Sequence, residues 1–147
     1  MSAPMSTATQ IAAAVRSGEA TAVDMVRAAL GRIEDRDDPI EAFRVVRRER
    51  AIAEAEDIDG RKDRATLPLA GVPVAIKDNV PVAGESMRVG SAATSEEPQT
   101  MDHPVVSRIR AAGGVVVGLT NVRELCVFGA TDSVYSVTRN PWNLSRR

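Results

Sequence analysis

Cysteine, histidine and aromatic residues are nearly absent from this sequence, which has one Cys, one His, one Trp, one Tyr and two Phe among 147 residues. A single cysteine excludes an intramolecular disulfide framework and fits a reducing compartment. A zinc site is not expected, because His103 and Cys126 have no second ligand of these types near them. Walker A and Gly-x-Gly-x-x-Gly motifs are also missing, so the sequence predicts no metal and no cofactor.

Long apolar runs are missing as well. No stretch approaches the roughly 20 apolar residues that a membrane-spanning helix needs. The first ten residues lack the basic start and the apolar block of a signal peptide. The sequence therefore predicts a cytoplasmic protein that does not enter a membrane.

The charges are balanced, but lysine is scarce. Nineteen basic and 20 acidic residues give a net charge of -1, which argues against a nucleic-acid partner because such modules carry a clear basic excess. Seventeen of the basic residues are arginine and only two, Lys62 and Lys77, are lysine. Apolar residues make up 44% of the chain, so a folded core is expected rather than disorder. This core must depend on close backbone approach, because 22 Ala and 19 Val dominate the apolar set.

The length fits a single domain, and its first part, residues 7–66, is predicted to be helical with one possible strand. Residues 1–6 are expected to be loose. Apolar residues recur at helical spacing between capping and stop signals, which predicts helices at 7–17, 21–36 and 47–59. A looser alternation at 40–46 is the possible strand.

The second part, residues 67–147, has an α/β pattern. Its predicted elements are a strand at 72–76, an irregular stretch at 78–103, a helix ending at Ala112 and a strand at 115–117. A strand, a crossover with a helix and a second strand normally form a parallel pair. Asp102 is expected to cap this helix, and Asn121 with Glu124 to cap a further short helix that ends at Phe128.

Lys77 is the strongest candidate for chemistry. It directly follows the apolar run Val72–Ile76 in a chain that otherwise relies on arginine. A desolvated lysine can give up its proton, whereas an arginine in a protein cannot. The carboxyl end of a buried strand is also where a general base is well placed. The simpler alternative is a lysine in solvent that pairs with Asp78 or another acid, and the residues alone leave both open.

From residue 67 onward, several ordered motifs are similar to those of one family. Residues 68–79, Pro-Leu-Ala-Gly-Val-Pro-Val-Ala-Ile-Lys-Asp-Asn, resemble the lysine-bearing segment of the amidase signature enzymes. Further family motifs are matched in order at 83–84, 90–91, 106–114, 117–121 and 138–143, and the opening fits at 17–21 and 41–43. The resemblance covers roughly residues 7–146.

This resemblance implies the N-terminal part of the amidase signature fold, a mixed sheet flanked by helices on both faces. It implies hydrolysis of carboxamides to carboxylic acid and ammonia or amine by a Ser–cis-Ser–Lys triad, with a small-molecule amide as substrate. Lys77 matches the triad lysine, which takes a proton from the bridging serine and later helps to protonate the leaving amine. By the same resemblance Cys126 and Phe128 are candidate substrate-binding residues near the acyl pocket. For both residues core packing is the competing interpretation, and for Cys126 this means a small side chain buried in an apolar helix.

One part of the family pattern has no counterpart here. The family places both serines and the oxyanion-hole amides on a Gly/Ser-rich loop, which nothing in this sequence resembles. The chain is therefore expected to be a truncated N-terminal third of one amidase domain, inactive alone, with a sheet edge open to self-association or pairing. Ser133 and Ser136 also depart from an Asn and a Gly that the family often has there. Residues 140–147, which hold the only Trp, fit either a frayed tail or this truncation.

Two other hypotheses stay open. The chain could be a non-catalytic partner that complements a serine-bearing fragment or a sibling subunit. It could also be an unrelated small α/β binding domain. The sequence does not name the amide substrate.

Overall fold

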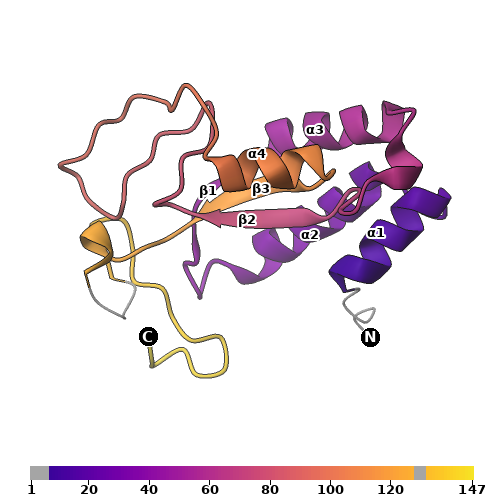
Figure 1. Cartoon of the computed structure of the whole chain (residues 1–147). Coiled ribbons are helices and arrows are strands. Elements are labelled where there is room, and N and C mark those ends of the chain that lie inside the picture. Colours follow the sequence, from indigo (N-terminus) through magenta and orange to yellow (C-terminus); the bar gives the residue numbers. More distant parts are fainter. Residues whose placement is uncertain (1–6, 128–131) are drawn as a thin grey trace.

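A mixed three-stranded sheet lies at the centre of the computed structural model, which describes residues 7–127 and 132–147 (Figure 1). Its strands are β1 (Phe43–Val46), β2 (Pro73–Lys77) and β3 (Val115–Thr120), in the order β1-β3-β2. β3 pairs antiparallel with β1 and parallel with β2. The predicted parallel pair and the possible strand within 40–46 are confirmed. The prediction for residues 1–6 concerns positions outside the described residues.

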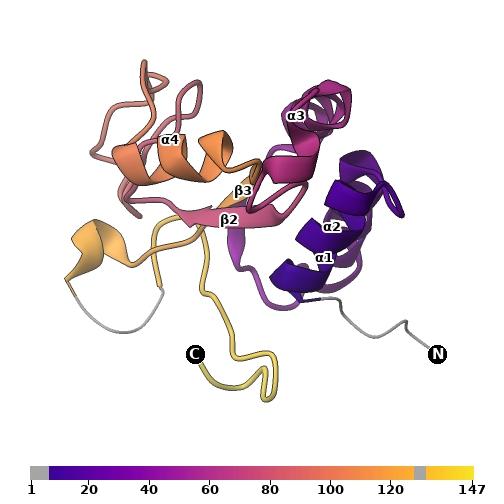
Figure 2. The ribbon, with the colours of Figure 1, turned by 45° about the vertical axis from the view of Figure 1, so that its right-hand side comes forward.

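Helices cover both faces of this sheet. They are α1 (Ala8–Ser17), α2 (Ala22–Arg36), α3 (Arg48–Gly60) and α4 (Pro104–Ala111), with short 3₁₀ turns η1 (Arg64–Thr66) and η2 (Glu124–Cys126). Helices α2 and α3 pack on Val115 and Val117 at one face, whereas α4 packs through Val106 on Val116 and Leu119 at the other. Figure 2 shows α4 on the opposite side of β2 from α1 and α2. Among the described residues, no helix is both long and apolar enough to cross a membrane.

The core is built from small side chains. Its largest cluster contains Val15, Ala22, Val26, Leu30, Ala51, Ala55, Ile58, Leu67, Ala70, Val115 and Val117. Gly118 shows how closely the backbone segments approach, because a Cβ there would lie 2.5 Å from the Val45 carbonyl oxygen and 2.9 Å from the Phe43 ring. β1 and β3 can therefore pair at this distance only if residue 118 has no side chain.

Local capping signals define the first two helices. Thr7 accepts a hydrogen bond from the Gln10 amide, and the Gln10 side chain accepts one from the Thr7 amide, which completes a capping box. Gly18 ends α1 in the left-handed conformation, with φ of 78°. Thr21 caps α2 by accepting a hydrogen bond from the Asp24 amide. The predicted starts and ends of both helices are confirmed.

The predicted cap of α4 is wrong. His103, not Asp102, is the N-cap residue, and its Nδ1 accepts a hydrogen bond from the Val105 amide at 3.2 Å. Asp102 instead accepts a hydrogen bond from the Ala83 amide at 2.7 Å and lies 3.0 Å from Nε of Arg110. The Asp102 carboxylate therefore links α4 to the loop that precedes it. The spacing of residues in the sequence could not show these contacts.

A cluster of charged side chains lies where β1 meets α3; we call the buried Arg47 and the half-buried Glu54, Glu85 and Arg110 the Arg47 cluster. The Arg47 side chain is only 3% exposed. It donates to the Val116 carbonyl at 2.6 Å, to Glu54 Oε1 at 2.7 Å and to Glu85 Oε1 at 2.9 Å. Arg110 of α4 also pairs with Glu54 Oε1 at 2.7 Å. The cluster therefore connects β1, α3, α4 and the loop after β2.

Lowering the pH should reduce the free energy of unfolding through protonation of Glu54. Burial raises the pKa of this carboxyl, but the hydrogen bonds and charges of Arg47 and Arg110 outweigh burial and hold the pKa below its usual 4.5. A carboxyl whose pKa is lower in the folded chain stabilises that chain above the unfolded pKa and loses this effect as the pH falls through the folded value. In urea titrations between about pH 6 and about pH 3, E54Q should therefore lose less free energy of unfolding than the unaltered chain. E56Q, at an exposed position of the same helix, is the control; equal losses in E54Q and the unaltered chain would contradict the prediction.

Candidate active site

Lys77 is the last residue of β2, beside the carboxyl end of β3, where its register partner is Thr120. Successive side chains of a strand point to opposite faces of the sheet. Ile76 is buried toward α4 and Asp78 is buried as well, whereas Ala75 and Lys77 are exposed. The predicted position at a strand end is confirmed. The lysine lies on the opposite face of β2, and the described residues leave this face exposed at Ala75 and Lys77.

The simpler alternative, a lysine in solvent that pairs with Asp78 or another acid, is wrong in its pairing with Asp78. The Asp78 carboxylate is bound by Arg44 instead, through Nε at 2.7 Å and Nη2 at 2.8 Å. Within the part of the chain that the structure describes, the Lys77 amine takes part in no hydrogen bond or ion pair. Its position therefore leaves the amine available to a group from outside that part.

A groove of about 380 Å³, lined mainly by apolar residues but also by Arg32, Arg36 and Asp37, runs along the same face of the sheet. Its floor and walls include Ala29, Ile33, Phe43, Pro73, Ala75 and Val117. Ala75 precedes Lys77 by two residues, so the groove leads along β2 toward the lysine. An exposed concave surface of this kind between a helix and a sheet is typical of a face that another layer of structure covers.

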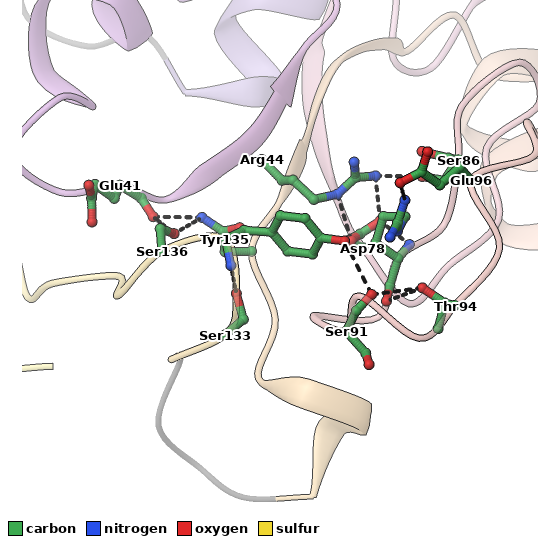
Figure 3. A network of polar contacts seen from close by, with 12 residues as sticks. Glu41, Arg44, Asp78, Ser86, Ser91, Thr94, Glu96, Ser133, Tyr135 and Ser136 are labelled. Atoms are coloured by element: carbon green, nitrogen blue, oxygen red, sulfur yellow. Dashed lines mark hydrogen bonds and ion pairs between the residues drawn. The ribbon is translucent and has the colours of Figure 1, made fainter.

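A polar network joins Arg44 of β1 to residues that follow the strands; we define it as Arg44, Asp78, Ser91 and Tyr135, which Figure 3 labels, together with Arg88. The guanidinium carbons of Arg44 and Arg88 lie 5.9 Å and 5.6 Å from the centre of the Tyr135 ring. The Tyr135 hydroxyl donates to the Ser91 carbonyl at 3.1 Å. The network thus joins β1, the loop after β2 and the segment after residue 131.

Hydrogen bonds join the loop that follows β2 to the loop that follows β3. Ser91 Oγ donates to Glu124 Oε1 at 2.7 Å, and the Leu125 amide donates to the Val89 carbonyl at 2.9 Å. A Cβ on Gly90 would lie 2.3 Å from the Val122 carbonyl oxygen, so this contact requires glycine. Both loops are therefore held at one end of the parallel strand pair, the end where Lys77 lies.

The prediction of a short helix that ends at Phe128 is wrong for the residues that the structure describes. Residues 124–126 form only the 3₁₀ turn η2. Asn121 donates to the Glu41 carbonyl and to Ser136 Oγ. Glu124 accepts from Ser91, so neither residue caps a helix. Cys126 is exposed, which overturns the prediction of a buried side chain in an apolar helix. Phe128 lies outside the described residues.

Sequence reasoning misses the polar network. The sequence predicts Asp78 only as a partner of Lys77 in solvent, yet it is 1% exposed and paired with Arg44. Nothing in the local pattern marks Arg88, and it too is buried. The only available signal is an acidic residue directly after a buried strand, where an unpaired charge is rare.

Comparison with known proteins identifies the family. The family model Amidase matches residues 24–147, so the chain belongs to the amidase family. It is 47% identical over 131 residues to the putative amidase AmiB2 of Mycobacterium tuberculosis. It is 41% identical over 143 residues to a glutamyl-tRNA(Gln) amidotransferase subunit of Streptomyces coelicolor. The crystal structure of the peptide amidase from Stenotrophomonas maltophilia matches with a TM-score of 0.83 and 30% identity.

These matches cover most of this chain but a small part of the relatives. AmiB2 is matched over 88% of this chain and 28% of its own length, and the amidotransferase subunit over 95% and 29%. The peptide amidase is matched over 97% of this chain and 31% of its own. The chain thus spans less than a third of the relatives' length and has the fold of the corresponding part of the amidase signature enzymes.

Proposed function

We propose that this chain contributes Lys77 as the general base of a site that hydrolyses carboxamides, and that both serines of the site come from polypeptide outside the sequence described. The observation that supports this most directly is the position of Lys77. Its amine has no partner within the described residues and stands on a sheet face that they leave open. The single cysteine fits a cytoplasmic location for this activity.

The proposed chemistry follows the family scheme. The neutral amine of Lys77 accepts a proton from the bridging serine, which takes the proton of the nucleophilic serine as this attacks the amide carbon. Collapse of the intermediate breaks the C–N bond, the amine leaves with a proton returned along the same path, and water releases the acid. Covering the open face would remove the amine from water, which favours the neutral form that a general base needs.

A chimera tests this proposal. The chain replaces the matching segment of AmiB2, and release of ammonia or amine is measured on a panel of carboxamides with unaltered AmiB2 as the reference. We expect the chimera to be active and the isolated chain to be inactive, since a base without nucleophile and oxyanion hole keeps only part of the mechanism. Amide hydrolysis by the isolated chain would contradict the proposal, as would a folded chimera without activity.

A second candidate is a non-catalytic partner chain. One observation in favour is the outer edge of β2, which pairs with no strand among the described residues. A second is the Streptomyces coelicolor relative, which is named as a subunit of an amidotransferase. Unpaired strand edges are sites where another chain can add a strand. Here the remainder of AmiB2, expressed as a separate chain, should co-purify with this one. A monomer by light scattering in the presence of that fragment would exclude the partner function.

A further inference from the structure

We propose that Asp78, held by Arg44, is a positioning residue that directs Lys77 onto the open face of the sheet. The role in catalysis rests on the proposed function of Lys77, whereas the geometric claim does not. Asp78 touches no reacting group in this scheme and acts only through its neighbour in the chain. The contacts of its carboxylate and of its backbone support this role.

Asp78 is only 1% exposed, and both of its carboxylate oxygens accept hydrogen bonds. Arg44 Nε binds Oδ2 at 2.7 Å, and Arg44 Nη2 binds Oδ1 at 2.8 Å, which is a bidentate pair (Figure 3). The Arg88 amide adds a third donor to Oδ1 at 3.3 Å. Arg44 also donates to the Ser86 carbonyl, so the pair connects β1 with the loop after β2.

The backbone of Asp78 is fixed as well. Its amide donates to the Thr120 carbonyl at 3.0 Å, and its carbonyl accepts from the Val89 amide at 3.1 Å. The amides of Asn79 and Val80 both donate to the Lys77 carbonyl, at 2.8 Å and 3.0 Å, which closes a turn directly after the lysine. Residue 78 is therefore held by side chain and backbone together.

These contacts determine the direction of Lys77. Because neighbouring side chains of a strand point to opposite faces, Ile76 on the α4 side places Lys77 on the other side, and the anchored Asp78 holds the end of β2 directly after the lysine. The long lysine side chain has several rotatable bonds, so its reach to a serine depends on where its Cα is held. A displacement of about 1 Å in a catalytic group can lower a rate by about 10²-fold.

The chain offers a matched control in Arg61 and Asp63. Arg61 also forms a bidentate pair, with Asp63 oxygens at 2.8 Å and 2.6 Å. This pair is exposed and lies on the connector between α3 and η1, away from β2. D63N therefore removes an ion pair of the same chemistry without touching the support of Lys77.

The first measurement uses the isolated chain. Backbone 15N relaxation should give an order parameter near 0.85 at Lys77 and Asn79 in the unaltered chain, and below about 0.6 in D78N. D63N should leave both values unchanged. If D78N prevents folding, R44K serves instead, because it keeps the positive charge and loses the bidentate geometry. Unchanged order parameters at Lys77 in the altered chain would overturn the proposal.

The second measurement uses the chimera. D78N should lower kcat by about 10²-fold with KM within about twofold, because only the alignment of the base changes. Added to K77M, D78N should cause no further loss, since a positioning residue acts only through the lysine. An equal loss in both backgrounds would show a general structural role and overturn the proposal. If the folded chimera is inactive, the proposed function fails, and the order parameters still decide the geometric claim.

Discussion

Lys77→Met in the chimera with AmiB2 is expected to lower kcat for carboxamide hydrolysis by about 10³-fold or more. Loss of a general base alone typically lowers a rate by about 10²- to 10⁴-fold, and members of a triad act as a unit. Methionine keeps the unbranched side chain and removes only the amine. Because the amine has no partner among the described residues, the free energy of unfolding of the isolated chain should change by less than about 0.5 kcal/mol.

Lys62→Met is the matched control for this experiment. Lys62 is the other lysine of the chain and is exposed, in the connector after α3. Its replacement should leave kcat and KM unchanged. If the chimera is active and K77M retains that activity, Lys77 is not the base.

Arg47→Met should cause the largest loss of stability. The substitution removes the donor shared by Glu54, Glu85 and the Val116 carbonyl, so the two half-buried carboxylates keep only Arg110 and Arg50 as partners. Breaking a buried ion pair by removing one partner lowers the free energy of unfolding by about 3 to 5 kcal/mol. Urea unfolding of the isolated chain, followed by far-UV circular dichroism, measures this difference.

Arg48→Met provides the comparison, because the neighbouring Arg48 pairs with Glu34 at 2.8 Å in solvent, with side-chain exposures of 48% and 70%. Exposed pairs contribute about 0 to 1 kcal/mol, so R48M should be nearly neutral. Similar losses in R47M and R48M would show that the Arg47 cluster contributes no more than a surface pair.

Features governed by neighbouring residues were predictable from the sequence. Thr7, Gly18 and Thr21 act within one helical turn of their partners, so the bounds of α1 and α2 follow from local signals. The parallel pairing of β2 and β3 follows from the wiring of a strand, a crossover and a strand. The position of Lys77 at the end of β2 belongs to the same class.

Features assembled from distant segments were not predictable. Asp102, Asn121 and Glu124 all fit local capping patterns, yet their side chains bind the loops around residues 83, 41 and 91. The polar network combines Arg44, Asp78 and Tyr135, which are far apart in the sequence. The sequence around such a polar residue looks the same whether its side chain bonds to a nearby helix end or to a distant loop. Only the tertiary structure shows which of these two partners it has.

The aromatic side chains give this chain two spectroscopic probes of different kinds. Trp142 is 94% exposed, so its emission is already that of an indole in water and is insensitive to unfolding of the core. Tyr135, the only tyrosine, has its ring centre 5.9 Å and 5.6 Å from the guanidinium carbons of Arg44 and Arg88 and reports the integrity of the polar network. A blue shift of the tryptophan emission when a serine-bearing chain is added would therefore measure association alone, and a titration on that signal would yield its Kd.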